Sequence, residues 1–461
     1  MTMHPDHTKS QSEYIRTAPW EPVFTRVLLP LERFTHQQSS SSLLLLLCTV
    51  VALILANSRF SEIYLHTLHT PIAISVSTLR FELSLQHWIN EALMSFFFLL
   101  VGLELKRELL VGELADKQRA ALPAIAAIGG ILVPAAIYWL WNPSGIEKSG
   151  WGIPMATDIA FAVGALCALG KRIPSALATF LIALAIVDDI GAVLVIAIFY
   201  TEQLHAAALL TSLSLTALLI VLNLGGVRHL APYLLLGILL WCAMLNSGIH
   251  ATLAGIILAF TIPVRAKYTH PYWIRQVTEI AQKMESHART DIDTLTQMDL
   301  DAQVSALEKN LELAQAPAQR LEHSLHFLVA FIIVPLFALA NAGIPIRWDD
   351  LLHITAHPVA LGVTSGLVLG KWMGITASCW LAIKIGIAAL PNSMQMRHIH
   401  GIGLLAGIGF TMSIFIADLA FTAAPEFLLL AKTGILLASL LAATLGYCWL
   451  RFACHNNKVA T

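Results

Sequence analysis

The sequence predicts an all-α polytopic membrane protein that crosses the bilayer about twelve times. Its 461 residues are 57% apolar and only 12% charged, and the mean hydropathy is +0.72. Soluble domains are typically about 45–50% apolar and about 25% charged. Apolar runs long enough to span a bilayer also recur along the chain. The net charge of −1 and six cysteines without paired spacing argue against a nucleic-acid binder and a disulfide scaffold.

The predicted spans follow one another with short connections, such as Thr201–Gln203, that suit tightly packed antiparallel helices. They cover residues 43–57, 85–104, 121–141, 153–170, 174–200, 204–224, 231–246, 248–264, 324–344, 357–383, 400–420 and 427–450. The first is as short as the core of a signal peptide. It follows 42 mostly polar residues, however, which is too many for a signal.

Lysine and arginine predict the orientation, because they collect on the cytoplasmic side of membrane proteins. With a cytoplasmic N-terminus, 22 of the 28 lie in inside segments and four in outside segments. The other two, Lys371 and Lys432, lie within spans. We therefore expect both tails, residues 1–42 and 452–461, in the cytoplasm, with spans 1–8 in 43–264 and spans 9–12 in 321–451.

Two more polar segments interrupt the spans. The outside loop 58–84 has alternating apolar residues, which fit a small hairpin or an extended loop. Such a hairpin would cover the membrane surface or pair two protomers as a homodimer. The cytoplasmic segment 265–320 holds 15 of the 57 charged residues, and its apolar residues between Val304 and Ala314 follow helical spacing. We expect a solvated helical insert there, with a regulatory segment as the alternative.

Ionisable residues in the middle of apolar spans are the strongest functional signal. Each costs about 2.5–3.5 kcal/mol at the bilayer centre, so it must face a partner or a water-filled cavity. Asp188 and Asp189 lie at the middle of the fifth span. Lys371 lies at the middle of the tenth, and Asp158 follows Thr157 in the fourth. A purely structural neutralisation of a neighbouring carboxylate is the alternative for Lys371.

The aspartate doublet predicts a site shared by protons and a small cation. Adjacent helix residues point about 100° apart, so Asp188 and Asp189 cannot face one partner and are expected to differ in role. With the Thr157 hydroxyl they supply hard oxygen ligands, which suit an alkali cation better than a soft metal. Burial and mutual repulsion favour the protonated carboxyl, so proton and cation are expected to compete.

The fourth and eleventh spans carry interruptions at matching positions. Gly152 and Pro154 open the fourth, and Gly407 and Gly409 precede Thr411 in the eleventh. Each is the middle span of a three-span set. Matching interruptions of this kind indicate broken helices that build a transporter site. Close helix packing is the alternative interpretation of the glycine pair.

Seven strings in the chain carry a resemblance to a known family. They are VGLELKREL (101–109), ATDIAFAVGAL (156–166), LAIVDDIGAVLVIAIFY (184–200), SGIHATLAG (247–255), PLFALANAG (335–343), GLVLGK (366–371) and GIGFTMSIFIA (407–417). Together they resemble the NhaA family of bacterial Na⁺/H⁺ antiporters from about residue 43 to 451. The resemblance implies inverted repeats with two discontinuous helices that cross at mid-membrane. It also implies a bacterial inner-membrane protein that exchanges cytoplasmic Na⁺ or Li⁺ for external protons under pH control.

The resemblance assigns roles to the intramembrane residues. Asp188 and Asp189 match the cation and proton site, with Asp189 as the main Na⁺ or Li⁺ ligand. Asp158 and Thr157 match the charge-compensating residues at the crossing, and Lys371 matches the membrane lysine of the family.

The resemblance also places six residues at a cytoplasmic funnel and in a pH response: Glu104, Arg107, Glu108, His250, Glu322 and His326. A solvated helix end is the alternative for the first three, and a satisfied core histidine for His250. Two departures, the long insert and Ala266 where an acidic residue is usual, leave the pH threshold open.

Functions of other classes fit the sequence less well. A cation channel would need a carbonyl filter or acidic rings, and a membrane prenyltransferase would need a DDxxD patch near the membrane surface. Another cation-coupled transporter is the nearest alternative. We expect no enzymatic activity, no cofactor and no nucleic-acid partner. The expected partner is the lipid bilayer, with a homodimer through the 58–84 loop as an open alternative.

Overall fold

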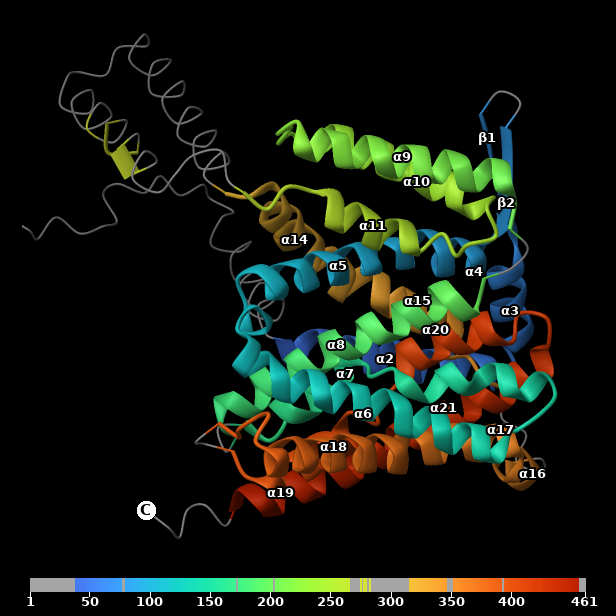
Figure 1. Cartoon of the computed structure of the whole chain (residues 1–461). Helices are drawn as coiled ribbons and strands as arrows, with labels where there is room; N and C mark the ends of the chain where they lie inside the picture. Colours follow the sequence, from blue (N-terminus) through green and yellow to red (C-terminus); the bar gives the residue numbers. More distant parts are fainter. Residues whose placement is uncertain are drawn as a thin grey trace, which may run out of the picture.

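A computed structural model describes most of the chain as one predominantly helical body in which most of the long helices run in roughly the same direction (Figure 1). The described residues are 38–76, 79–170, 173–201, 204–265, 315–345, 351–391 and 394–455, with a few between 274 and 282. The helix predicted between Val304 and Ala314 and almost all of the N-terminal tail lie outside them.

The elements follow the predicted spans closely. The first half of the chain contains α2 (Gln38–Ala56), α3 (Ser61–His69), β1 (Pro71–Val76), β2 (Leu79–Ser84), α4 (Leu85–Trp88), η2 (Ile89–Leu93), α5 (Met94–Leu110), η3 (Glu113–Ala115), α6 (Lys117–Trp141), η4 (Ile146–Met155), α7 (Ile159–Cys167), α8 (Ser175–Phe199), α9 (Ala206–Leu224), α10 (Leu230–Leu245) and α11 (Leu253–Thr261). The second half contains α14 (Pro317–Leu328), η6 (Val329–Ile333), α15 (Val334–Asn341), α16 (Leu351–Ala356), α17 (Pro358–Ser365), η7 (Gly366–Gly370), α18 (Lys371–Ile385), α19 (Met396–Leu405), α20 (Phe410–Ala420) and α21 (Pro425–His455).

Among the described residues, seven helices are long and apolar enough to cross a membrane, or up to ten if each bent pair counts once. The bent pairs are α2 with α3 (111°), η4 with α7 (40°) and α19 with α20 (49°). The other two predicted ranges coincide with the shorter helices α10 and α11. The eighth predicted span is helical only from Leu253, because turns occupy the residues before it. The last helix continues to His455, into the predicted C-terminal tail.

The loop between the first two predicted spans forms α3 and a hairpin. β1 pairs antiparallel with β2, with Pro71 opposite Ser84 and Val76 opposite Leu79. The hairpin lies beyond the ends of α4 and α10 (Figure 1). Of the two predicted alternatives for this segment, the hairpin is the one that forms; a homodimer through it stays a prediction.

Apolar side chains cover the outside of the helices. On α9 and α10, at one flank of Figure 1, Leu210, Leu213, Leu224 and Leu235 each expose more than half of their surface. Soluble monomers rarely expose apolar surface in contiguous patches. This exterior therefore fits a multi-pass membrane protein.

Three long helices contain a π-helical turn, η2, η6 or η7. The turn η7 ends directly before Lys371 and packs against α6. A Cβ atom at Gly370 would lie 2.7 Å from the Cα atom of Pro134, so this close approach needs glycine. Widened turns of this kind are frequent at functional sites, and this one sets the position of Lys371 beside α6 and α8.

Candidate functional site

The site forms where two helices are broken. Non-helical backbone separates η4 from α7 and α19 from α20. The Asp158 N–H donates to the carbonyl oxygen of Ile408 at 2.7 Å. The Ser413 hydroxyl donates to the carbonyl oxygen of Ile153 at 2.8 Å. The two interruptions predicted from the sequence therefore contact each other, although they are about 250 residues apart in the chain.

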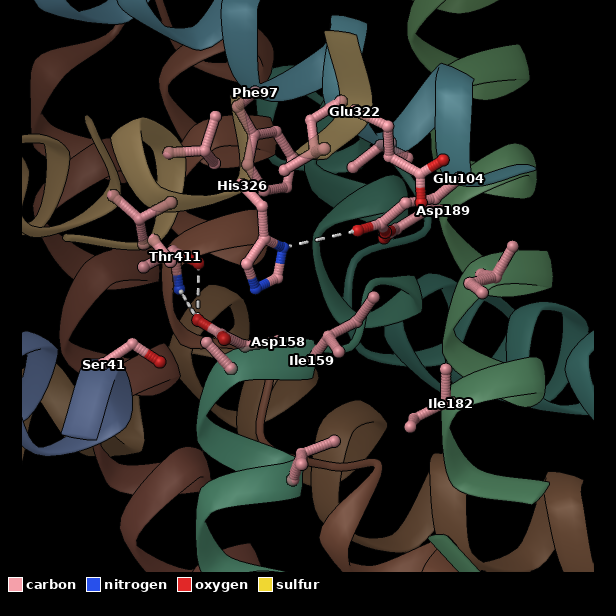
Figure 2. A pocket seen from close by; sticks show the side chains of 18 of the residues that line it. Ser41, Phe97, Glu104, Asp158, Ile159, Ile182, Asp189, Glu322, His326 and Thr411 are labelled. Carbon is pink, nitrogen blue, oxygen red and sulfur yellow. Dashed lines mark hydrogen bonds and ion pairs between the residues drawn. The ribbon is translucent and has the colours of Figure 1, made fainter. Parts of the chain in front are cut away.

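Asp158 caps the half-helices on both sides of this contact. Its Oδ1 accepts the N–H of Phe161 in the first turn of α7, at 3.1 Å. Its Oδ2 accepts the N–H of Thr411 in α20 at 3.0 Å and the Thr411 hydroxyl at 2.5 Å (Figure 2). Helix N-termini carry partial positive charge, and two of them meet here. One fully buried carboxylate thus compensates both.

Asp188 is held through one of its two carboxyl oxygens, whereas its Oδ1 has no hydrogen-bond partner among the described residues. Its Oδ2 accepts a hydrogen bond from the ammonium group of Lys371, and both side chains are completely buried. The Thr157 hydroxyl lies 2.8 Å from the same oxygen and 2.9 Å from the carbonyl oxygen of Ala406. Thr157 therefore connects the carboxylate of Asp188 to the break between α19 and α20.

Asp189 points in a different direction from Asp188 and lines a cavity. Within the described part of the chain, neither of its carboxyl oxygens has a hydrogen-bond partner, although the side chain is only 1% exposed. The adjacent carboxyls of the doublet thus have different surroundings, as helical geometry requires.

The cavity has a volume of about 810 Å³ and extends from the helix breaks to the ends of α5 and α14. Asp189, Asp158 and Thr157 line its inner part, whereas Asp188 and Lys371 do not line it. Carboxyl and hydroxyl oxygens therefore converge on an enclosed space. These oxygens suit a small hard cation.

Charged residues line the mouth of the cavity. On α14, Glu322 and His326 lie one helical turn apart. The Arg107 Nε lies 3.0 Å from the Glu322 Oε1, and the His326 Nδ1 lies 3.9 Å from the Glu104 Oε1 (Figure 2). A path lined by ionisable groups therefore leads to Asp189.

Of the six residues predicted for the funnel and the pH response, two do not line the cavity. Glu108 does not line the cavity; its carboxylate pairs with Arg107 at 3.2 Å and accepts the Glu113 N–H at 3.0 Å. His250 lies in the turn before α11, with Nε2 2.6 Å from the carbonyl oxygen of Tyr200. That contact agrees with the alternative interpretation of His250 as a satisfied histidine.

Sequence reasoning did not assign a site role to Thr411. Its backbone N–H and its hydroxyl both donate to Asp158. The available signal was a hydroxyl residue two positions after Gly409, in the first turn of a half-helix. Hydroxyl residues are common at helix N-termini because of their local hydrogen bonding.

The amino-acid sequence is similar to those of known proteins over nearly the whole chain. A family model described as Na⁺/H⁺ antiporter 1 matches residues 32–450. A Na⁺/H⁺ antiporter NhaA 1 of Saccharophagus degradans is 48% identical over 94% of this chain and 93% of its own. The NhaA antiporters of Wolinella succinogenes (49%; 93% of this chain, 94% of its own) and Sulfurimonas denitrificans (47%; 94% and 98%) are similarly close.

Proposed function

Because the chain belongs to the Na⁺/H⁺ antiporter 1 family, we propose that it is a secondary antiporter that extrudes cytoplasmic Na⁺ or Li⁺ in exchange for external protons. The observation that carries the proposal is Asp189, a buried carboxyl that faces a cavity and has no hydrogen-bond partner among the described residues. The relatives named above as Na⁺/H⁺ antiporters support the same exchange.

The exchange follows from competition at Asp189. A buried carboxylate without a partner is costly, so Asp189 must hold either a proton or a cation. Cytoplasmic Na⁺ enters through the cavity and takes the place of the proton. After the site turns to the outside, a proton takes the place of Na⁺. If the site faces one side at a time, the two movements are coupled without ATP.

Asp158 and Asp188 keep the site in shape while Asp189 changes its occupant. Asp158 is held by donors from both half-helices, namely the Phe161 N–H on α7 and the Thr411 N–H and hydroxyl on α20. Asp188 is held by Lys371 and Thr157. We assign the variable charge of the site to Asp189, with Thr157 and Asp158 as additional oxygen ligands for the cation.

We place the cavity mouth at the cytoplasmic face of a bacterial inner membrane, with both termini on that side. The support is the distribution of lysine and arginine, since Arg107, which lines the mouth, lies with Arg119 in the predicted inside segment between the second and third spans. Twelve spans, with the two broken helices crossing at mid-membrane, fit this orientation. Glu104, Glu322 and His326 line the mouth, and we propose that this group makes cation entry respond to cytoplasmic pH.

The experiment is Na⁺-induced dequenching of a ΔpH dye in everted vesicles, scanned from about pH 6.5 to 8.5 across the range where histidine titrates. Wild-type protein should give a signal that Asp189→Asn abolishes. Asp116→Asn, a change at an exposed carboxylate that caps α6, is the matched control and should retain exchange. Full exchange in a folded Asp189→Asn variant would contradict the proposal. Downhill Na⁺ flux without proton movement would indicate a channel.

A further inference from the structure

A second group of buried polar side chains lies beyond the inner end of the cavity. Asp418 of α20 and Lys432 of α21 form an ion pair, with 2.9 Å between Oδ1 and Nζ. Their side chains are only 15% and 10% exposed. Asn90 of η2 donates its amide N–H to Asp418 Oδ2 at 3.2 Å, and Asn341 of α15 donates to Asn90 Oδ1 at 2.7 Å. None of these four residues lines the cavity.

Three phenylalanines separate this polar group from the cavity. Phe98 of α5, Phe337 of α15 and Phe415 of α20 are each at most 1% exposed. The ring centroid of Phe415 lies 5.4 Å from that of Phe98 and 6.2 Å from that of Phe337. The rings therefore form one apolar layer contributed by three helices.

On all three helices a cavity-lining residue, a phenylalanine and a residue of the polar group follow one another in the same order. On α20, Thr411 lines the cavity, Phe415 follows four residues later, and Asp418 follows three residues after that. At about 1.5 Å per residue, the aromatic ring lies roughly one helical turn from each polar layer. The other two helices repeat the order of cavity residue, phenylalanine and asparagine with Val334, Phe337, Asn341 on α15 and Val101, Phe98, Asn90 on α5 and η2.

We propose that Asp418, Lys432, Asn90 and Asn341 form the external gate of the transport pathway, closed in this structure. The proposal rests on the proposed antiport function and its orientation. An inward-open cavity requires that the far side be shut, and these four side chains join α20, α21, α15 and η2 there. Ionisable groups inside a membrane protein are expensive and mark functional sites by default.

The chemistry of the gate also suits the proposed cargo. The Lys432 ammonium is paired with the Asp418 carboxylate, to which a departing Na⁺ would bind if Lys432 were absent. The amide oxygens of Asn90 and Asn341 lie next to it, and oxygen ligands of this kind suit a hard cation. When the gate opens, Lys432 moves away and Asp418 becomes a transient external ligand.

The test measures access to the cavity from outside. In a variant whose six native cysteines are replaced, Val334→Cys reports on the cavity side of the phenylalanine layer. A membrane-impermeant thiol reagent should label it in everted vesicles and only weakly in right-side-out vesicles. Adding Asp418→Asn with Lys432→Met removes both charges of the gate together. Labelling from outside should then rise about tenfold, because the interaction is made in only one of the two states.

Two further variants keep the result interpretable. Glu113→Gln with Arg119→Met removes a surface ion pair of 3.5 Å in the same way and should leave labelling unchanged. Asn90→Ala keeps the buried ion pair intact, should fold if the double variant does not, and should give a smaller rise. Unchanged external labelling in every gate variant that folds would overturn the proposal. Parent vesicles that show no Na⁺/H⁺ exchange would instead overturn the proposed function, since labelling does not depend on exchange.

Discussion

Among the described residues, two aspartate–lysine ion pairs lie inside the helical body, and their surroundings differ. The Asp188–Lys371 pair is completely buried and lies beside Asp189, which has no hydrogen-bond partner among the described residues. The Asp418–Lys432 pair is slightly exposed, and its neighbours Asn90 and Asn341 are hydrogen-bonded to each other. The first pair therefore adjoins a carboxyl without a partner that faces the cavity, whereas the second adjoins amides that satisfy one another.

The largest expected effect separates the two regions by function. Asp189→Asn should abolish Na⁺-dependent proton movement at every pH, because no other carboxyl that lines the inner cavity lacks a partner among the described residues. Asp418→Asn with Lys432→Met should retain exchange at a changed rate. Dye dequenching in everted vesicles measures exchange in both variants. An equal loss of exchange in the two folded variants would show that the two regions do not differ in function.

A second prediction concerns how much the Asp188–Lys371 ion pair contributes to the stability of the protein. Lys371→Met leaves Asp188 buried without its cation, and breaking a buried pair in this way typically costs about 3–5 kcal/mol. The double variant Asp188→Asn with Lys371→Met should recover most of that loss. Thermal unfolding midpoints in detergent would show both effects; a destabilisation that persists in the double variant would point to packing instead.

The same double variant tests whether Lys371 carries a transported proton. If its proton is transported, each cycle of the variant moves one proton fewer, and the response of exchange to membrane potential decreases. If Lys371 only steadies the helices, the response stays unchanged. Exchange in proteoliposomes with and without an imposed potential distinguishes the two roles.

Thr411→Val should have a smaller effect on the inner region. It removes one hydroxyl donor from Asp158 but keeps the backbone N–H donor at 3.0 Å. A hydrogen bond to a charged group typically contributes about 1.5–3 kcal/mol. We expect a several-fold higher Na⁺ concentration for half-maximal dequenching. Thr433→Val, a change at a hydroxyl that bonds within its own helix α21, is the control and should match the wild type.

The smallest effect is expected at the cavity mouth. His326 is 60% exposed and 3.9 Å from Glu104, and exposed ion pairs contribute little. His326→Gln removes an imidazole from the group proposed to set the pH response, so it should move the onset of exchange by less than about one pH unit. An onset that stays at the wild-type pH would contradict the assignment of His326 to the pH response.

Composition and local pattern alone predicted the membrane class, the approximate helix ranges and the identity of the intramembrane charges. Apolar length and lysine distribution are local properties, and an aspartate in an apolar run is conspicuous without any structure. The two helix interruptions were equally readable, because glycine and proline act on their own backbone. The hairpin was not decided, since its alternating residues also fit an extended loop.

The tertiary structure decided which of these groups meet. Lys371 is 183 residues from Asp188, and Thr411 is 253 residues from Asp158. No local spacing encodes such contacts, because they arise when separate helices pack side by side. For the same reason, Lys432 was visible in the sequence as an intramembrane lysine, but only packing of α20 against α21 gave it Asp418 as a partner.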